Sequence, residues 1–172
     1  MKKIFIIIFS LCLNFNFATA NTDIAFIDMD KVISMSKAGV SVFKQLNVIN
    51  DKNLKKFKTT ESNLKTKETK IISQKKLISN EEFQSSISKL RLEVEKYNED
   101  RKKIINNFNR LKIVNTNNLL KMINPILIKY SNEKSISIIL QKKDLIMGKK
   151  ELDITDEVIK IVNSEIKEFK IK

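Results

Sequence analysis

Few residues in this chain have the types and spacing that chemistry requires. Its 172 residues include no His, one Cys and two Gly. Without imidazole, and with Cys12 as the sole thiol, the usual zinc ligands are missing and a triad-type nucleophile has no ordinary base. Gly39 and Gly148 cannot build a glycine-rich phosphate loop, and no Ser–Lys pair is singled out by spacing. We therefore expect no enzyme activity, no catalytic residue, no cofactor and no metal.

The carboxylates of Asp28 and Asp30 form the one pattern that begins like a calcium loop. Val32 and Ile33 stand where such a loop needs a third ligand and a glycine. We expect these acids instead to cap a helix that follows the first strand.

Positive charge is the other chemically distinctive feature. The formal net charge is +13, and between residues 43 and 124 there are 19 Lys or Arg against 9 Asp or Glu. Arg101, Lys102 and Lys103 form a continuous basic run. Such charge bears on partners and solubility, not on fold. The run could contact unfolded clients or an anionic lipid, although a solvated helix face is the plainer interpretation.

Residues 1–20 have the pattern of an export signal. Two lysines precede an apolar run over residues 4–13, and an A-x-A cleavage site ends at Ala20. Asn14 and Asn16 end the run well short of the roughly 20 apolar residues that span a bilayer. Cleavage after Ala20 would remove the two lysines and the only cysteine, leaving a soluble periplasmic chain of net charge +11 with no disulfide.

Two long helical segments over residues 41–124 must position the charged residues. One face of the outgoing segment has Phe43, Asn50, Phe57, Leu64, Ile71 and Ile78 at every seventh position, and the return segment has Phe83, Ile87, Leu90, Val94, Tyr97, Ile104, Phe108 and Leu111. This heptad pattern predicts an antiparallel coiled-coil hairpin, the arm. Ser79 and Glu82 fit a capping box, which places the arm tip near residues 79–80. The outgoing seam is half polar, so its distal part should fray.

Residues 21–40 and 125–172 are expected to form an oligomerisation head. Pro125 predicts a kink or a fresh helical start at the arm base. Apolar runs at residues 24–27, 135–140 and 145–148 predict three short strands, and Asp153 or Thr155 should cap a closing helix. The apolar face of that helix comprises Val158, Ile161, Val162, Ile166 and Phe169.

So few elements make a poor independent core, which predicts that other copies complete the head. The expected fold is therefore α+β and predominantly helical, with a small β head and a long hairpin arm. The residues expected in the shared head core are Ile24, Phe26, Ile136, Ile138, Ile139 and Leu140.

Both ends of this arrangement resemble one family. The segment IAFIDMDKVI at residues 24–33, KAG at 37–39 and LDITDEVI at 152–159 are similar to the Skp (OmpH-like) periplasmic chaperones. The resemblance implies a jellyfish-like homotrimer, in which strands of three subunits form a central barrel and three arms enclose a cavity. It also implies a holdase that protects unfolded outer-membrane proteins from aggregation during transit, without ATP.

Some members of that family bind lipopolysaccharide through a basic cluster on the return helix. The nearest match in this chain is Arg101-Lys102-Lys103. Ile104 and Glu93 occupy positions where the family pattern has basic residues, so the chain departs from that pattern.

A different class of function also fits the sequence. A structural coiled-coil envelope protein could use the basic arm to bind anionic surfaces. Nucleic-acid binding through the same arm is disfavoured by export and by the scarcity of aromatic residues for stacking. Capture of unfolded clients would distinguish a holdase from the structural alternative.

Overall fold

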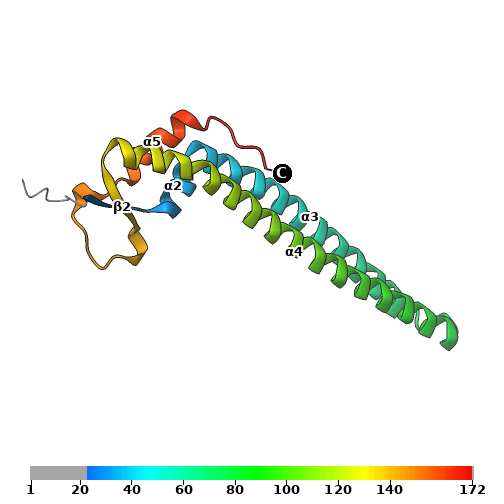
Figure 1. Cartoon of the computed structure of the whole chain (residues 1–172). Coiled ribbons are helices and arrows are strands. Elements are labelled where there is room, and N and C mark those ends of the chain that lie inside the picture. The colour runs from blue at the N-terminus through cyan, green and yellow to red at the C-terminus, as the bar shows by residue number, and fades with distance from the viewer. Residues whose placement is uncertain (1–22, 172) are drawn as a thin grey trace, which may run out of the picture.

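The computed structural model describes residues 23–171, and the expected signal at residues 1–20 lies outside them. A small head carries one long helical hairpin (Figure 1). The elements in chain order are β1 (Asp23–Ile27), α2 (Met29–Met35), α3 (Lys37–Gln74), α4 (Asn80–Glu133), β2 (Ile136–Gln141), the 3-10 turns η2 (Lys142–Asp144) and η3 (Lys150–Leu152), and α5 (Thr155–Glu165). The expected fold class, a mainly helical α+β chain with a long arm, is confirmed. None of the described helices is long and apolar enough to cross a membrane.

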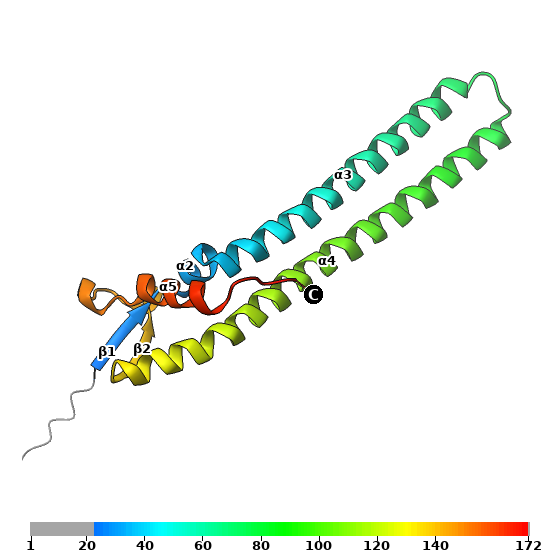
Figure 2. The ribbon, with the colours of Figure 1, turned by 90° about the horizontal axis from the view of Figure 1, so that it is seen from above.

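The arm consists of α3 and α4, which run antiparallel (Figure 2). The 38 residues of α3 give a limb about 57 Å long at 1.5 Å per residue. At the tip the capping box is confirmed, because Ser79 Oγ accepts from the Glu82 amide at 3.2 Å and the Glu82 carboxylate accepts from the Ser79 amide at 3.1 Å. These reciprocal bonds satisfy two amides that the start of α4 would otherwise leave without partners.

Pro125 lies inside α4 and does not begin a new helix. The expectation of a fresh start is therefore wrong. The proline is exposed, so the carbonyl that loses its amide donor can face water. In Figure 2 the ribbon of α4 bends where the helix enters the head.

The head sheet has two strands, β1 and β2, which pair in parallel. The expected third strand at residues 145–148 is wrong, since this segment is an irregular loop between η2 and η3. The outer edge of β1 is already occupied, because the Ile154 amide donates to the Phe26 carbonyl at 3.0 Å and Asp153 forms a bridge with Phe26. The loop folds over the Phe26 ring instead. A Cβ at Gly148 would lie 2.6 Å from Phe26 Cε1, so a larger residue there would force the ring or the loop to shift.

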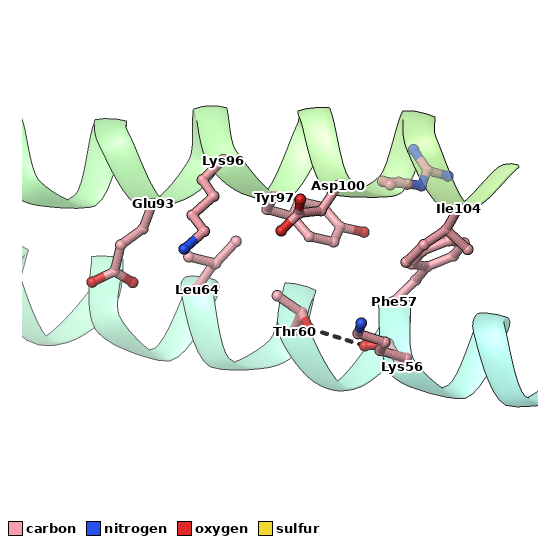
Figure 3. A pocket seen from close by; sticks show the side chains of 10 residues that line it. Lys56, Phe57, Thr60, Leu64, Glu93, Lys96, Tyr97, Asp100 and Ile104 are labelled. Carbon is pink, nitrogen blue, oxygen red and sulfur yellow. Dashed lines mark hydrogen bonds between the residues drawn. The ribbon is translucent and has the colours of Figure 1, made fainter. Parts of the chain in front are cut away.

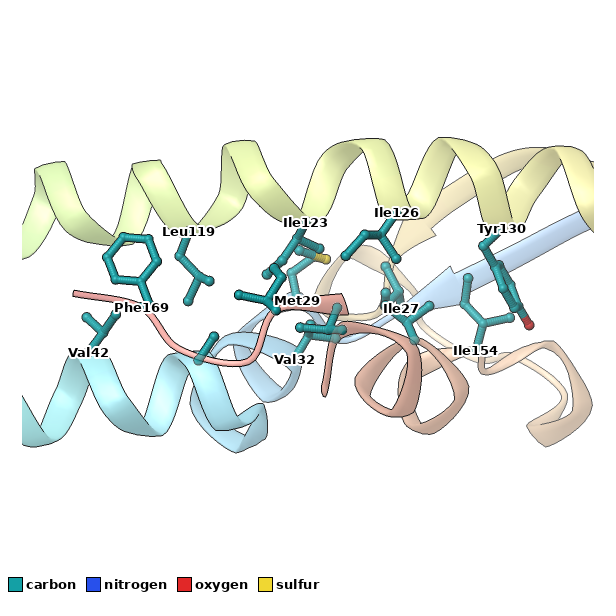
Figure 4. Close-up of a cluster of buried hydrophobic side chains, with 14 of the residues drawn as sticks. Ile27, Met29, Val32, Val42, Leu119, Ile123, Ile126, Tyr130, Ile154 and Phe169 are labelled. Atoms are coloured by element: carbon teal, nitrogen blue, oxygen red, sulfur yellow. The ribbon is translucent and has the colours of Figure 1, made fainter. Parts of the chain in front are cut away.

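The head core lies where α2, α5, the base of α3 and the last turns of α4 meet (Figure 4). Its fully buried side chains include Val32, Leu119, Ile123, Val158 and Val162. Where these elements meet, side chains of one element form hydrogen bonds with backbone groups of another.

Of the two acids expected to cap α2, Asp28 is the N-cap and Asp30 lies in the first turn of the helix. Asp28 Oδ1 accepts from the Lys31 amide at 2.9 Å, and the Asp28 amide donates to Thr155 Oγ1 at 2.9 Å. The Asp153 carboxylate accepts from the Thr155 amide at 3.0 Å, at the start of α5. The formal N-cap of α5 is Ile154, which makes no side-chain cap bond. One polar cluster thus joins β1, α2 and α5.

The C-terminal tail, residues 166–171, runs from α5 along the base of the arm (Figures 1 and 2). Ser41 Oγ and Gln45 Nε2 both donate to the Phe169 carbonyl, at 3.2 and 2.7 Å, and the Ile171 amide donates to Gln45 Oε1 at 3.3 Å. The apolar face expected for the closing helix is buried, except that Ile161 is only partly so. Phe169 belongs to the tail, because α5 ends at Glu165.

Candidate functional site

The two flanks of the hairpin differ in chemistry. One flank, here called the cationic flank, has six cations against two carboxylates: Lys56, Lys67, Lys70, Lys89, Lys96 and Arg101 with Glu93 and Asp100. The opposite flank is a groove with an apolar floor, here called the acid-rimmed groove. Its rim has four carboxylates against two cations: Glu61, Glu68, Glu95 and Glu99 with Lys65 and Arg91. The arm therefore has two distinct candidate binding surfaces.

An aromatic cluster forms the centre of the cationic flank (Figure 3). Phe57 is 8% exposed and meets the Tyr97 ring edge-on at 6.5 Å and 77°. The Arg101 guanidinium lies 5.5 Å from the centre of the Phe57 ring, which favours a cation–π interaction. Arg101 interrupts the heptad pattern, yet its position over Phe57 lets it cover the seam. The cavity beside this cluster has a volume of about 250 Å³.

Polar contacts tie the two helices together across the seam. The Tyr97 hydroxyl donates to Glu61 at 2.5 Å, and burial together with this bond raises the pKa of Tyr97. Lys67 pairs with Glu93 at 2.6 Å, although both side chains are about half exposed. An exposed ion pair of this kind contributes at most about 1 kcal/mol, so the packing of Phe57 and Tyr97 holds the hairpin more than the salt bridge does.

The acid-rimmed groove exists because the seam is unbalanced. On α4, Ile87, Leu90 and Val94 lie along one side of the groove, while α3 contributes Leu64 and Ile72 together with the charged Glu61, Lys65 and Glu68. The apolar side chains of α4 are therefore only partly covered by α3, and Ile87 and Leu90 are half-buried. Val94 remains 38% exposed and Ile72 58% exposed. The groove has a volume of about 890 Å³, more than three times that of the cavity on the cationic flank.

The structure places the three basic residues that were candidates for client or lipid contact on different sides of α4. Arg101 covers Phe57 on the cationic flank. Lys103 lies 3.9 Å from Glu99, one turn earlier on α4, and Lys102 is exposed. Successive helical residues point about 100° apart, so the run does not form one cationic surface. The two flanks could have been found from the sequence by projecting both helices and aligning them in the antiparallel register of the hairpin.

The head presents an apolar face of its own. Ile24, Ile138 and Leu140 lie on one side of the β1–β2 pair and are 43%, 44% and 39% exposed. Within the described chain, β2 pairs only with β1, so its other edge is open. We call these three side chains and this edge the head face.

The other three residues expected in the shared head core are turned toward their own chain. Phe26 is 7% exposed and lies under the loop that contains Gly148. Ile136 and Ile139 are half-buried and pack against the head core. They also line a cavity of about 440 Å³ between β2 and α4.

Two head residues with shifted pKa values, Asp153 and Tyr130, form hydrogen bonds that connect elements of the head. Partial burial opposes ionisation of Asp153, but hydrogen bonds from Lys142 and Thr155 outweigh it and lower the pKa of Asp153 to about 2. Burial, followed by a hydrogen bond to Glu157, raises the pKa of Tyr130 to about 12. Across residues 23–171 no group of three or more acidic side chains is placed to hold a metal ion.

Comparison with known proteins identifies the family. The model of the family described as "Outer membrane protein (OmpH-like)" matches residues 23–162. The fold is also similar to the crystal structure of a candidate outer membrane chaperone (OmpH-like) from Caulobacter crescentus CB15, with a TM-score of 0.75 at 13% sequence identity, over 89% of this chain and 90% of that one. No curated protein gives a significant match. Since the family match covers most of the chain and includes both strands and both arm helices, this protein belongs to the OmpH-like family.

Proposed function

We propose that this chain is a non-enzymatic, ATP-independent holdase chaperone of the periplasm, which as a homotrimer binds unfolded outer-membrane proteins between its arms and prevents their aggregation. The observation that carries the proposal is the arm itself. It is a hairpin whose return helix exposes apolar side chains that the outgoing helix covers only in part. Such a surface can hold an unfolded chain through many weak contacts.

The head face supports assembly of several copies. Ile24, Ile138 and Leu140 are apolar and more than a third exposed, although they belong to a strand pair beside the main core. An open strand edge with an apolar side tends to pair with another chain. Joining the head faces of three copies would bury these groups and set three arms around one space, as the resemblance to the Skp (OmpH-like) family implies.

Binding an unfolded client requires no chemical step, and the arm has the features that weak, reversible binding needs. Its surface combines scattered apolar groups with an excess of positive charge, 19 Lys or Arg against 9 Asp or Glu between residues 43 and 124. Charge of this kind accelerates encounter with oppositely charged segments more than it strengthens the final complex. The half-polar seam also lets the distal arm flex, so that one cavity could take clients of different size.

Dilution of a urea-unfolded outer-membrane protein tests the proposal. The chain without residues 1–20 is present at one trimer per client, and no nucleotide is added. We expect turbidity to be suppressed, and an equal mass of serum albumin to leave aggregation unchanged. Full aggregation in the presence of the chain would contradict the holdase. If the same chain then bound anionic vesicles, the structural envelope protein would be the better explanation.

A further inference from the structure

We infer that the acid-rimmed groove is a docking site for unfolded-chain segments in which apolar residues are interspersed with Lys or Arg. This inference rests on the proposed holdase function and assigns one class of client segment to one surface. The overall charge of the chain would suggest the opposite preference, for acidic segments.

The floor of the groove requires an apolar occupant. Ile87, Leu90 and Val94 face it from α4, and Ile72 from α3 is 58% exposed. The outgoing helix covers these side chains only in part: Ile87 and Leu90 are half-buried and Val94 is 38% exposed. On the α3 side, the charged Glu61, Lys65 and Glu68 stand beside Leu64 and Ile72. A volume of about 890 Å³ is large enough to take several side chains of an extended segment.

The rim of the groove selects the charge of the occupant. The rim has four carboxylates and two cations, whereas the cationic flank has six cations and two carboxylates. Glu61 accepts from Tyr97, and Glu99 lies 3.9 Å from Lys103. Glu68 and Glu95 form no ion pair with any residue in the described range, so both carboxylates can receive a partner's cation.

A second copy of the arm fits this groove less well than such a segment does. The cationic flank of another arm could match the rim, but it could not fill the floor. Its largest apolar group, Phe57, is 8% exposed and lies in its own seam beneath Arg101. The floor would then remain largely uncovered. A segment with both apolar and cationic side chains satisfies floor and rim together.

Two matched peptides test the preference directly. Both are ten residues long with the same apolar residues and one Trp, and they differ only in having four Lys or four Glu. The protein contains no Trp, so the fluorescence of the peptide reports binding without background. With the assembled chain at low salt, we expect the Lys peptide to bind at least fivefold more tightly than the Glu peptide. Equal binding, or tighter binding of the Glu peptide, would overturn the inference.

Charge-neutralising variants locate the site. The double change Glu68→Gln and Glu95→Gln removes two unpaired rim carboxylates. Since an exposed ion pair changes affinity by up to about fivefold, we expect the Lys peptide to bind about fivefold to twentyfold more weakly. The matched control is Lys70→Gln with Lys89→Gln on the cationic flank, which should not weaken binding of the Lys peptide. Similar losses in both variants would overturn the assignment to the groove.

Methyl NMR and sedimentation complete the test. The Lys peptide should shift the methyl signals of Ile72 and Ile87 in the groove and leave that of Ile104, on the cationic flank, unchanged. A change in oligomer mass for the Glu68 and Glu95 variant would show a contact between copies and overturn the inference. If the chain suppresses aggregation normally but binds the Lys and Glu peptides equally, the inference about the groove is overturned and the proposed holdase function is not. Peptide binding as described without suppression would overturn the proposed function alone.

Discussion

The C-terminal tail, residues 166–171, is expected to lock the head onto the base of α3. The Gln45 amide group makes two bonds to it, one to the Phe169 carbonyl at 2.7 Å and one from the Ile171 amide at 3.3 Å. The Phe169 ring is 8% exposed and belongs to the head core. The tail lies beyond residue 162, where the family match ends. We therefore predict that Gln45→Ala and Phe169→Ala are coupled.

The magnitude follows from the contacts. Truncating a buried Phe to Ala typically costs about 3–5 kcal/mol, and a tail at the chain end can relax, so we expect about 2–3 kcal/mol for Phe169→Ala. Gln45→Ala removes the two hydrogen bonds to the tail, worth about 0.5–1.5 kcal/mol each, or about 1–3 kcal/mol in total. If Phe169→Ala releases the tail, then Gln45→Ala costs only its bonds to Ser41 within α3. The coupling free energy in a double-mutant cycle should therefore be about 1–3 kcal/mol.

Urea unfolding followed by circular dichroism measures all four corners of the cycle. The protomer concentration must be the same throughout, because assembly adds to apparent stability. Lys44→Ala, next to Gln45 but exposed, is the control and should change the free energy of unfolding by less than about 0.5 kcal/mol. Additive effects of Gln45→Ala and Phe169→Ala, to within about 0.5 kcal/mol, would refute the locking role of the tail.

Three further predictions concern the head. Gly39→Ala should lower the free energy of unfolding by about 1–3 kcal/mol despite better helix propensity, because the new Cβ would lie 1.5 Å from the Ile33 carbonyl oxygen; a stabilised variant in urea melts would contradict this packing. Asp153 has a pKa lowered to about 2, so its contribution to stability is complete above its ordinary pKa near 3.8 and is lost as the pH falls through about 2. Asp153→Asn should then be less stable at pH 7 and should lose less stability between pH 4 and pH 2. The midpoint of urea unfolding measures this, and midpoints of variant and unmodified chain that fall equally between pH 4 and pH 2 would argue against it. Ile138→Asp should reduce the oligomer mass measured by light scattering, because it places a charge in the head face, and an unchanged mass would exclude this face from assembly.

The matched control for the head face is Val48→Asp. Val48 is also a β-branched, exposed side chain, at 63%, but it lies on α3 in the arm. It should leave the oligomer mass unchanged. Ile139→Asp would be a poorer test of assembly, because Ile139 packs against its own head core and the change would disturb folding too.

Features set by neighbouring residues could be predicted from the sequence. The Ser79 and Glu82 capping box and the Asp28 cap each need only a few consecutive residues, and the structure contains both. The prediction of a third strand was wrong because residues 153–154, and not residues 145–148, pair with the outer edge of β1, while the loop at 145–148 lies over the Phe26 ring. No local pattern at residues 145–148 reports that competition.

The candidate site was predicted only in outline for a similar reason. The heptad pattern indicated that the outgoing seam was thin, and the groove lined by Ile87 and Leu90 is its consequence. Which charges border the groove depends on how α3 and α4 are aligned. The basic run at residues 101–103 is continuous in sequence, which suggests a single cluster. On a helix the three side chains point in different directions.

Native mass spectrometry of the chain mixed with an unfolded outer-membrane protein tests the central claim most directly. The account predicts one complex that contains three copies of this chain and one client, formed without nucleotide. A client bound to a single copy, or a three-copy particle that never binds a client, would contradict it.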